Sequence, residues 1–419
     1  MVYREQIPID KGIDNSLKLL MEGYQYIPKR RRKFNSDIFE TRILGGQRTV
    51  CMAGADAAEI FYDNEKFNRH GVAPKRIRET IFGEKSVQTL DGCKHVHRKK
   101  LLMKFMSSEN LQRIVKIVAN EWTHAMVIWQ QQDDVVLFEE MKKLLTIAAC
   151  EWAGVPLAKH EVNMRSQQLA SLFKSAAAVG PRHWRGRRSR NQLEMWLVTM
   201  VEQIRNHQLI VDEEKPLYHI VWHKDLDGNL LNPRVAAVEV INLLRPIVAI
   251  SVYITFSAHA LYHFPREEEN VSSGEEGYME LFVQEVRRFY PFFPYAVARV
   301  REDFLWSGHD FKKGNLVLLD IYGTNRHPDL WLRPNEFDPS RFENWQGGLF
   351  DLIPQGGGNF IKDHRCPGEW LTIEVMKVSL NMLVNKMDYK VPKQNLQYSL
   401  VKIPSIPKSG FIMRHVRKK

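Results

Sequence analysis

One cysteine lies where a thiolate could bind a metal ion. Residues 351–377 read DLIPQGGGNFIKDHRCPGEWLTIEVMK, so a glycine-rich loop leads to Cys366 and then directly into an amphipathic helix. Unpaired N–H groups and the positive dipole at a helix start favour the thiolate, which is the metal-binding form. The glycines at 356–358 would let the backbone approach a flat cofactor, and Arg365 would add positive charge. Taken alone, this pattern is more typical of a buried cysteine in an ordinary loop.

Two further motifs precede this loop in a fixed order. Glu285 and Arg288 form an E-x-x-R pair on a predicted helix, where residues three apart share a face. The later segment FDPSRF brings Arg341 into a proline-containing loop. E-x-x-R, then F-x-P-x-R-F, then a glycine-rich loop ending in C-P-G resembles the cytochrome P-450 superfamily. The resemblance implies a mainly α fold with minor β in a single domain, 1–419. It also implies haem b held by an axial thiolate from Cys366, with both arginines and the glutamate forming a structural network.

Two departures from that superfamily indicate a branch. The long apolar stretch Val235–Phe264 lacks the acid–alcohol pair that relays protons, and reads Arg245-Pro246 instead. The cysteine loop is longer than usual and has Gln355 where a phenylalanine is expected. Both departures are similar to the fatty-acid peroxygenases, whose bacterial members hydroxylate fatty acids near the carboxyl end with hydrogen peroxide as co-substrate. The resemblance spans about residues 11–417.

Arg245 suits a reaction that starts from peroxide. Hydrogen peroxide brings both oxygens and both electrons, so no redox partner is obligatory, but a proton must still move for O–O cleavage. Arginine stays protonated and cannot move that proton, whereas its planar fork can hold a carboxylate that can. We therefore expect Arg245 to anchor a medium- to long-chain fatty acid for hydroxylation at the alpha or beta carbon. Pro246 should bend the helix and open space above the iron. Without the haem motifs, a snorkelling arginine and an incidental kink would be the simpler interpretations.

The resemblance also places basic residues of the first hundred positions beside the haem. Arg69, His95 and Arg98 match positions near the haem propionates, where they would donate charge-assisted hydrogen bonds. The alternative for the segment HVHRK is an exposed basic helix face. A zinc site is a weaker interpretation, because no further ligands follow H-x-H at a suitable spacing.

Three residues are expected to contact the substrate. By the resemblance, Phe82 and Gln88 lie over the distal face of the haem, and Phe292 lines the acyl channel, although a core aromatic fits Phe292 nearly as well. In that family a histidine at the position of Gln88 goes with decarboxylation to terminal alkenes, whereas glutamine is found in hydroxylases. A neutral amide cannot transfer a proton as imidazole can. We therefore predict hydroxy acids with minor alkene.

A helical scaffold with a small sheet must position these residues. Segments within 108–207 repeat the i, i+3, i+4 apolar spacing of amphipathic helices. A long helix should begin at Pro233 with Asn232 as its N-cap. Glu239 and Arg245 interrupt its apolar run, so we expect a buried helix and no transmembrane segment. Strand-like segments are expected at 38–44, 48–53 (joined by Gly45-Gly46), 297–304, 315–323 and 409–416.

The composition is that of one large globular protein with a basic surface. Sixty Lys and Arg against 49 Asp and Glu give a net charge of +11, partly in the runs 29–33 and 182–190. These runs are interpreted as solvated faces, because no recognised nucleic-acid motif accompanies them. Four cysteines without C-x-x-C spacing and no apolar leader predict a cytoplasmic protein. Two alternatives stay open: a reductase-dependent haem-thiolate monooxygenase, and a non-catalytic haem sensor.

Overall fold

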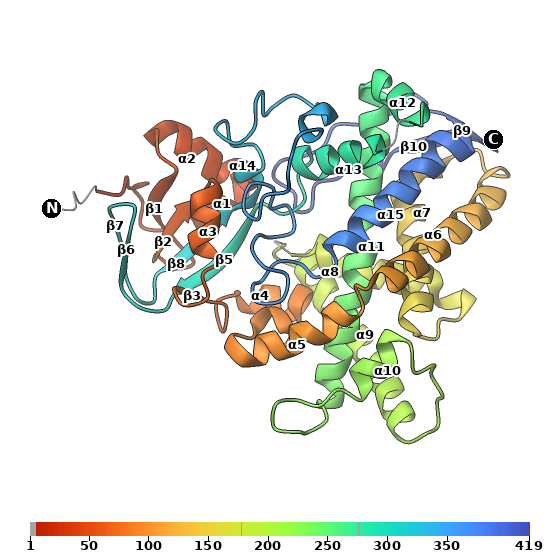
Figure 1. Ribbon diagram of the computed structural model, residues 1–419, viewed down its shortest axis with the longest axis horizontal. Helices are drawn as coiled ribbons and strands as arrows, with labels where there is room; N and C mark the ends of the chain where they lie inside the picture. Colours follow the sequence, from red (N-terminus) through yellow and green to blue (C-terminus); the bar gives the residue numbers. More distant parts are fainter. Residues whose placement is uncertain (1–5, 177, 275–276) are drawn as a thin grey trace.

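The computed structural model describes residues 6–176, 178–274 and 277–419. A strand-rich lobe near the N-terminus lies beside a larger helical region, as Figure 1 shows. This arrangement confirms the predicted mainly α fold with minor β.

The predicted hairpin near the N-terminus is confirmed. Strands β1 (Ile38–Ile43) and β2 (Gln47–Met52) pair antiparallel, with Ile43 opposite Gln47. The turn between them places Gly45 and Gly46 at φ +85° and +81°, a conformation that glycine adopts without strain. This hairpin starts the main sheet.

The main sheet has the strand order β1-β2-β8-β5-β3. Strand β2 pairs parallel with β8 (Leu316–Asp320), and β8 pairs antiparallel with β5 (Tyr295–Val300). The edge strand β3 is Phe67–Asn68. Two smaller sheets join β6 (Phe304–Trp306) with β7 (His309–Phe311), and β10 (Ile412–Lys418) with β4 (Val135–Val136) and β9 (Met387–Lys390).

Two predicted strands were too long. The segment 297–304 divides, because β5 ends at Val300 and the chain turns before β6. The segment 315–323 stops at Asp320, whose carboxylate accepts a hydrogen bond from Gly323 N at 2.7 Å and so caps α14 (Ile321–Thr324). An aspartate cap can end a strand within an apolar run, and hydrophobic pattern alone does not reveal it.

The predicted helices of the middle region are confirmed as α6 (Ser108–Trp129), α7 (Leu137–Ala153) and α9 (Pro181–Arg205). Helix α11 (Pro233–His263) begins as predicted, with the Asn232 side chain accepting a hydrogen bond from Arg234 N at 2.9 Å. It runs without interruption through Pro246, whereas a bend there stays a prediction.

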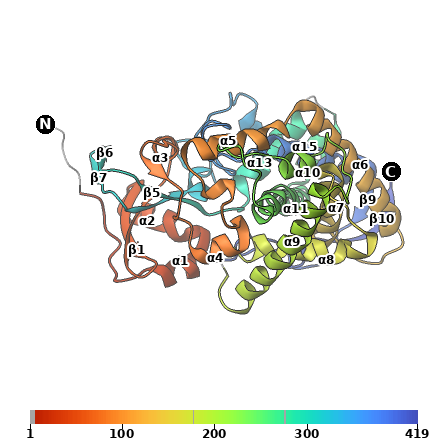
Figure 2. The same ribbon diagram turned by 90° about the horizontal axis from the view of Figure 1, so that it is seen from below.

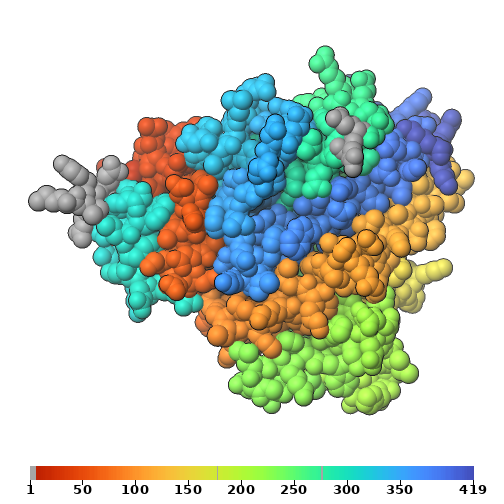
Figure 3. Space-filling model, viewed as in Figure 1, coloured from red at the N-terminus to blue at the C-terminus, as the bar shows by residue number. Residues whose placement is uncertain are grey.

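Helix α11 is the core of the molecule. It is long and apolar enough to cross a membrane, but 89% of its most apolar window is buried inside the protein. It packs against α7, α8 (Val162–Lys174), α9 and α15 (Glu369–Asn381), and Figure 2 shows it nearly end-on among them. Helix α6 lies against α15, so the orange and blue segments of Figure 3 meet along one face. The remaining helices are α1 (Ser16–Glu22), α2 (Tyr26–Phe34), α3 (Ala55–Phe61), α4 (Lys75–Ile77), α5 (Gly92–Lys104), α10 (Pro216–Val221), α12 (Pro265–Ser272) and α13 (Tyr278–Phe289).

The predicted glutamate–arginine network is present. On α13, the Glu285 carboxylate accepts hydrogen bonds from Arg288 Nε and Nη2 at 2.6 and 2.7 Å, and both side chains are fully buried. Arg341, in the short helix η5 (Pro339–Phe342), places Nε 3.2 Å from Glu285 Oε2. That contact is an ion pair rather than an aligned hydrogen bond, since this Nε has no well-oriented acceptor among the described residues. The network fastens the 337–342 loop to α13.

Candidate active site between Cys366 and Arg245

The cysteine loop brings Cys366 to the start of α15. Cys366 N donates to Gln355 O at 2.9 Å, and the Gln355 side-chain amide donates to Cys366 Sγ at 3.7 Å. The same amide reaches Thr372 Oγ1 at 3.1 Å, while Gln355 Oε1 accepts from Arg287 at 3.2 Å. The glutamine that replaces the expected phenylalanine therefore donates a weak hydrogen bond to the sulfur and is itself fixed on two sides.

The predicted preference for a thiolate holds only with a bound cation. Burial raises the pKa of the Cys366 thiol, and this outweighs the lowering by the Gly368 N–H and by Lys99. Arg365 does not supply the expected free charge, because its Nε pairs with Glu369 Oε2 at 2.7 Å. The nearby cation is Lys99, which donates to Asp363 O at 3.1 Å and to Arg365 O. A ferric iron at the sulfur would supply the charge that the helix terminus alone does not.

Arg245 is buried, with 8% of its surface exposed. Its Nη1 donates to Ile81 O at 2.9 Å. Burial, and to a lesser degree the charge of Arg190, lower its pKa to about 9, whereas Cys366 acts in the opposite direction. The guanidinium is still mainly protonated at neutral pH. Burying a cation without a counter-charge is energetically costly. The presence or absence of a carboxylate beside a buried arginine therefore indicates whether it could bind an anionic ligand.

Most buried arginines have a carboxylate partner, and two do not. The structure describes nine arginines that are buried, and neither Arg69 nor Arg245 has an aspartate or glutamate oxygen within 4 Å among the described residues. The seven that form ion pairs are Arg30, Arg98, Arg165, Arg190, Arg287, Arg288 and Arg365. The two exceptions can bind anionic ligands.

Helix α11 holds the loop that carries Phe82 and Gln88. Asn242, one turn before Arg245, places its Nδ2 3.3 Å from Gln88 Oε1, from Phe82 O and from Glu239 Oε2. Glu239 also accepts from Val87 N at 2.9 Å. Phe82, through its carbonyl, and Gln88 are therefore joined to α11 one turn before Arg245, both are half-buried, and their contact with the substrate stays a prediction. The sequence contains no signal for Asn242 as the connecting residue, because its partners lie more than 150 positions away.

Phe292 lies farther along α11. Its ring stacks on Tyr253 with centroids 4.5 Å apart, and its carbonyl accepts from Tyr24 Oη at 2.7 Å. Tyr253 follows Arg245 by eight residues, about two helical turns, and its buried hydroxyl has no hydrogen-bond partner among the described residues. Phe292 therefore lies beside Tyr253. Gln88 and the Phe82 carbonyl instead contact Asn242, earlier on α11.

The three residues predicted to bind the haem propionates differ in how many of their polar atoms already have a partner. Arg69 donates to Phe61 O at 3.1 Å and lies 4.3 Å over the Phe61 ring, and burial lowers its pKa to about 10. Arg98 Nη1 is instead committed to Glu239 Oε1 at 2.7 Å, although its buried Nε has no partner among the described residues. His95 stacks on His364 at 4.0 Å, and burial lowers its pKa to about 3. The imidazole of His95 is therefore neutral, and its N–H can still donate to an ionised propionate, so its role stays a prediction.

These residues fit a haem. A flat dianionic cofactor needs a thiolate at the iron and cations at its carboxylates, and Cys366, Lys99 and Arg69 offer these groups. Asp363 is near both cations, since it raises the pKa of Lys99 and of Arg69. Among the described residues, Arg69 has no carboxylate partner and Arg98 Nε has no hydrogen-bond partner, and propionates would satisfy these buried groups. Lys99 is a candidate that sequence reasoning missed, although it stands in the HVHRK segment.

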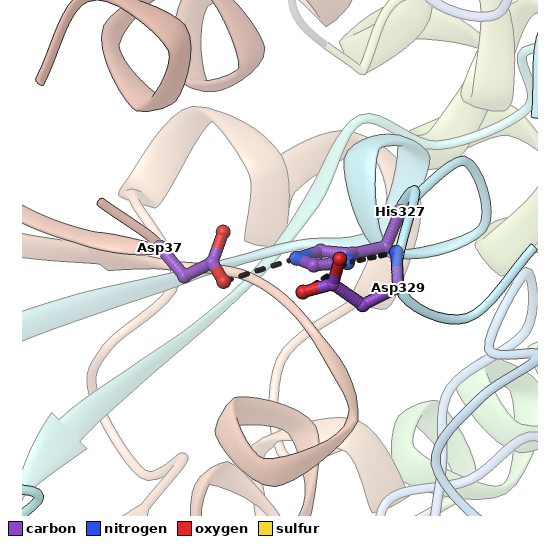
Figure 4. A group of neighbouring side chains, drawn as sticks. All are labelled: Asp37, His327 and Asp329. Atoms are coloured by element: carbon purple, nitrogen blue, oxygen red, sulfur yellow. Dashed lines mark hydrogen bonds and ion pairs between the residues drawn. The ribbon is translucent and has the colours of Figure 1, made fainter. Parts of the chain in front are cut away.

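A second polar cluster lies away from this site and does not suit a metal. Asp37, His327 and Asp329 converge in Figure 4. His327 Nδ1 accepts from Asp329 N at 3.2 Å, and Nε2 lies 3.0 Å from Asp37 Oδ2 without a well-oriented hydrogen bond among the described residues. Burial would raise the pKa of Asp37, but His327 and Arg31 hold it below its usual value. His327 Nδ1 is occupied by a backbone N–H and Asp37 is already paired with Arg31, so the cluster offers few free ligand atoms to a metal ion.

Comparison with sequence families matches residues 277–412 to the family described as cytochrome P450. Among curated proteins, a beta-amyrin 28-monooxygenase of Solanum lycopersicum is 24% identical over 437 aligned positions, which cover 95% of this chain and 90% of the relative. This distant relative agrees with the fold.

Solved structures give closer matches. Cytochrome P450EX alpha (CYP152N1) with myristic acid is 46% identical, with 99% of this chain and 100% of the other covered and a TM-score of 0.96. Cytochrome P450SP alpha (CYP152B1) is 43% identical over 97% of this chain and 100% of the other, with a TM-score of 0.95. A single-residue variant of cytochrome P450 OleT in complex with arachidonic acid is 35% identical over 99% of each chain, with a TM-score of 0.96.

Proposed function

Since the chain belongs to the CYP152 family of the cytochrome P450 superfamily, we propose that it hydroxylates fatty acids at the alpha or beta carbon with hydrogen peroxide. The family makes it a haem-thiolate oxidoreductase that uses haem b. The position of hydroxylation and the use of peroxide are parts of the proposal.

The unpaired guanidinium of Arg245 carries this proposal. It is buried and has no carboxylate within 4 Å among the described residues, so a fatty-acid carboxylate would supply the missing counter-charge. Its Nη1 is used by Ile81 O, which leaves Nη2 and Nε for the ligand. Relatives solved with myristic and arachidonic acid support a medium- to long-chain acid as the partner.

Each residue around the bound carboxylate has a separate role in the proposed reaction. Haem b held by Cys366 would supply the oxidising iron, and thiolate ligation favours O–O cleavage of peroxide. Arg245 holds the carboxylate, which moves the proton, because arginine cannot. Anchoring the acid end leaves only its first carbons within reach of the iron. Gln88, a neutral amide held by Asn242, adds no second acid–base group, which favours hydroxy acids over alkenes.

The remaining assignments complete the proposal. Pro246 bends α11 beside the haem, Phe82 contacts the acid end, and Phe292 lines the acyl channel. Arg69 binds a propionate, with lesser contributions from His95 and Arg98. The chain forms one haem domain, 1–419, in the cytoplasm, and requires neither a redox partner nor a nucleic acid.

Product analysis of the haem-loaded protein tests the proposal. With palmitate and hydrogen peroxide, we expect mainly alpha- or beta-hydroxypalmitate by mass spectrometry. Arg245→Ala should lower kcat/KM by about two to four orders of magnitude, because losing one partner of a buried ion pair costs about 3–5 kcal/mol. Arg245→Lys keeps the charge but loses the fork, and should recover part of the activity. Arg113→Ala, on α6, is the control and should act like the unchanged enzyme.

Other outcomes select the alternatives. Product that forms only with NAD(P)H and redox partners indicates a reductase-dependent monooxygenase. A thiolate-type spectrum without any response to fatty acid, and without product, indicates a haem sensor. Near-normal turnover by Arg245→Ala contradicts the assigned role of Arg245.

A further inference from the structure

A cleft of about 380 Å³ lies beside Gly83, in the loop that carries Phe82. Its walls come from the short helix η2 (Arg78–Phe82) and the residues after it, from α9, and from the start of α11. The charged side chains along these walls include Arg78, Glu84, Arg187, Glu194 and Arg234. The cleft is partly open to solvent, and Gly83 and Arg190 lie in its wall.

Two ion pairs lie in the walls of this cleft. Arg78 Nη1 lies 3.1 Å from Glu84 Oε2, and Arg234 Nε lies 2.7 Å from Glu194 Oε2. A hydrocarbon chain placed here would remove water from these charges without replacing their hydrogen bonds, which is unfavourable. The two ion pairs therefore favour small polar molecules over the acyl chain, whereas the rest of the accessible lining, which includes Val235 and Val238, is mainly apolar.

The backbone turn at 81–83 contacts both Arg190, which lines the cleft, and Arg245. Gly83 has φ +81°, and a Cβ there would overlap the Arg190 guanidinium and lie 2.7 Å from Val238 Cγ1. Arg190 Nη1 donates to Ile81 O at 3.2 Å, the same carbonyl that accepts from Arg245 Nη1 at 2.9 Å. The two arginines thus approach the same turn, Arg190 from the cleft and Arg245 from the site.

We propose that this cleft is the port through which hydrogen peroxide reaches the active site, and that Arg190 closes its inner end. The proposal rests on the proposed function, because it assigns a route to the co-substrate of that reaction. Hydrogen peroxide is small, neutral, and both donates and accepts hydrogen bonds, so it can exchange with water along charged walls. Glu194 accepts from Arg190 Nε at 2.6 Å, so release of the closing contact requires the whole planar guanidinium to move away from Ile81 O and from Glu194 together.

A bulky residue in the cleft tests the port. Asn191 lines the cleft from α9, whereas Met195, one turn later and 71% exposed, does not. Asn191→Trp should raise KM for hydrogen peroxide several-fold while the fatty-acid Kd, measured from the haem spectrum, stays unchanged. Met195→Trp, the same substitution on the same helix, should change neither constant. Equal peroxide KM values for both variants would overturn the port, and weaker fatty-acid binding by Asn191→Trp would assign the cleft to the acyl chain instead.

Cyanide binding provides a test that does not depend on turnover. Cyanide is a small polar ligand of ferric haem, and stopped-flow absorbance gives its rates of association and dissociation. A blocked route should lower both rates by the same factor in Asn191→Trp and leave the equilibrium constant unchanged. Unchanged rates would overturn the port. If cyanide rates fall in this variant but the parent enzyme makes no product with peroxide, the port stands as a small-ligand route and the proposed function fails.

Discussion

At the scale of single residues, Gln88 sets the expected product. Its Oε1 accepts from Asn242 Nδ2 at 3.3 Å, which fixes the side chain against α11 one turn before Arg245. Gln88→His would place a group that accepts and donates protons beside the substrate carboxylate. We expect the alkene fraction to rise at the expense of hydroxy acids, measured by gas chromatography of the products. Gln88→Asn is the control without a titratable group, and an equal product ratio in both variants would contradict the role of the amide.

The cysteines allow a matched test of the iron ligand. Cys366→Ser should abolish the thiolate-type spectrum of the ferrous carbon monoxide complex, because an alcohol does not replace the thiolate at the iron. Cys93→Ser, at an exposed free cysteine on α5, should keep that spectrum. A thiolate spectrum that persists in Cys366→Ser would require another ligand.

Residue type alone did not decide which arginines bind ligands. Arg69 and Arg98 received the same predicted role, yet Arg98 pairs with Glu239, 141 positions away, and Arg69 has no carboxylate partner among the described residues. Ion pairs between distant segments are set by the fold. The sequence could therefore identify the candidate arginines, but not which of them already has a carboxylate partner. Arg245 was identified because it stands in the apolar helix where the superfamily resemblance leads to an expected acid–alcohol pair.

At the scale of elements, the sequence was informative where one pattern decides the structure. Helix α11 followed from its Asn232 cap and its apolar length, and the β1–β2 hairpin from two glycines. Boundaries failed where a side chain ends an element, as Asp320 does after β8. The parallel pairing of β2 with β8 joins segments more than 260 positions apart, and periodicity carries no information on that register.

The link between α13 and the η5 loop makes an element-scale prediction. Glu285 is the shared partner of Arg288 and Arg341, and all three side chains are buried. Glu285→Gln should lower the free energy of unfolding by about 3–5 kcal/mol, because it leaves two buried cations without a counter-charge. Urea unfolding of the haem-loaded protein measures the change.

An exposed pair supplies the control for that measurement. Asp303 and Lys312 lie 3.1 Å apart with about half of each side chain exposed, so Asp303→Asn should change stability much less. Equal losses in both variants would mean that burial does not determine the importance of the Glu285 network.

At the scale of the whole molecule, each buried titratable group with a shifted pKa contributes to the pH dependence of the free energy of unfolding. Asp320 is 1% exposed, and its Oδ2 has no hydrogen-bond partner among the described residues. Burial raises its pKa from 3.8 to about 7, while the Gly323 N–H, Arg31 and His327 act in the opposite direction. The folded protein therefore holds a proton between about pH 4 and pH 7 that the unfolded chain has already released.

That difference gives the pH dependence a definite sign. The free energy of unfolding falls with rising pH wherever the folded state binds more protons than the unfolded state. The Asp320 carboxyl therefore stabilises the fold fully below about pH 4, and this contribution is lost by about pH 7. Above about pH 7 it no longer changes with pH. The loss amounts to about 4 kcal/mol at most, since one pKa unit is about 1.4 kcal/mol. Asp320→Asn keeps the cap acceptor for Gly323 N and cannot titrate, so its unfolding free energy should fall less between pH 4 and pH 7 than that of the unchanged protein. Urea unfolding at intervals across this range measures both curves, and parallel curves would mean that Asp320 is already ionised in the folded molecule.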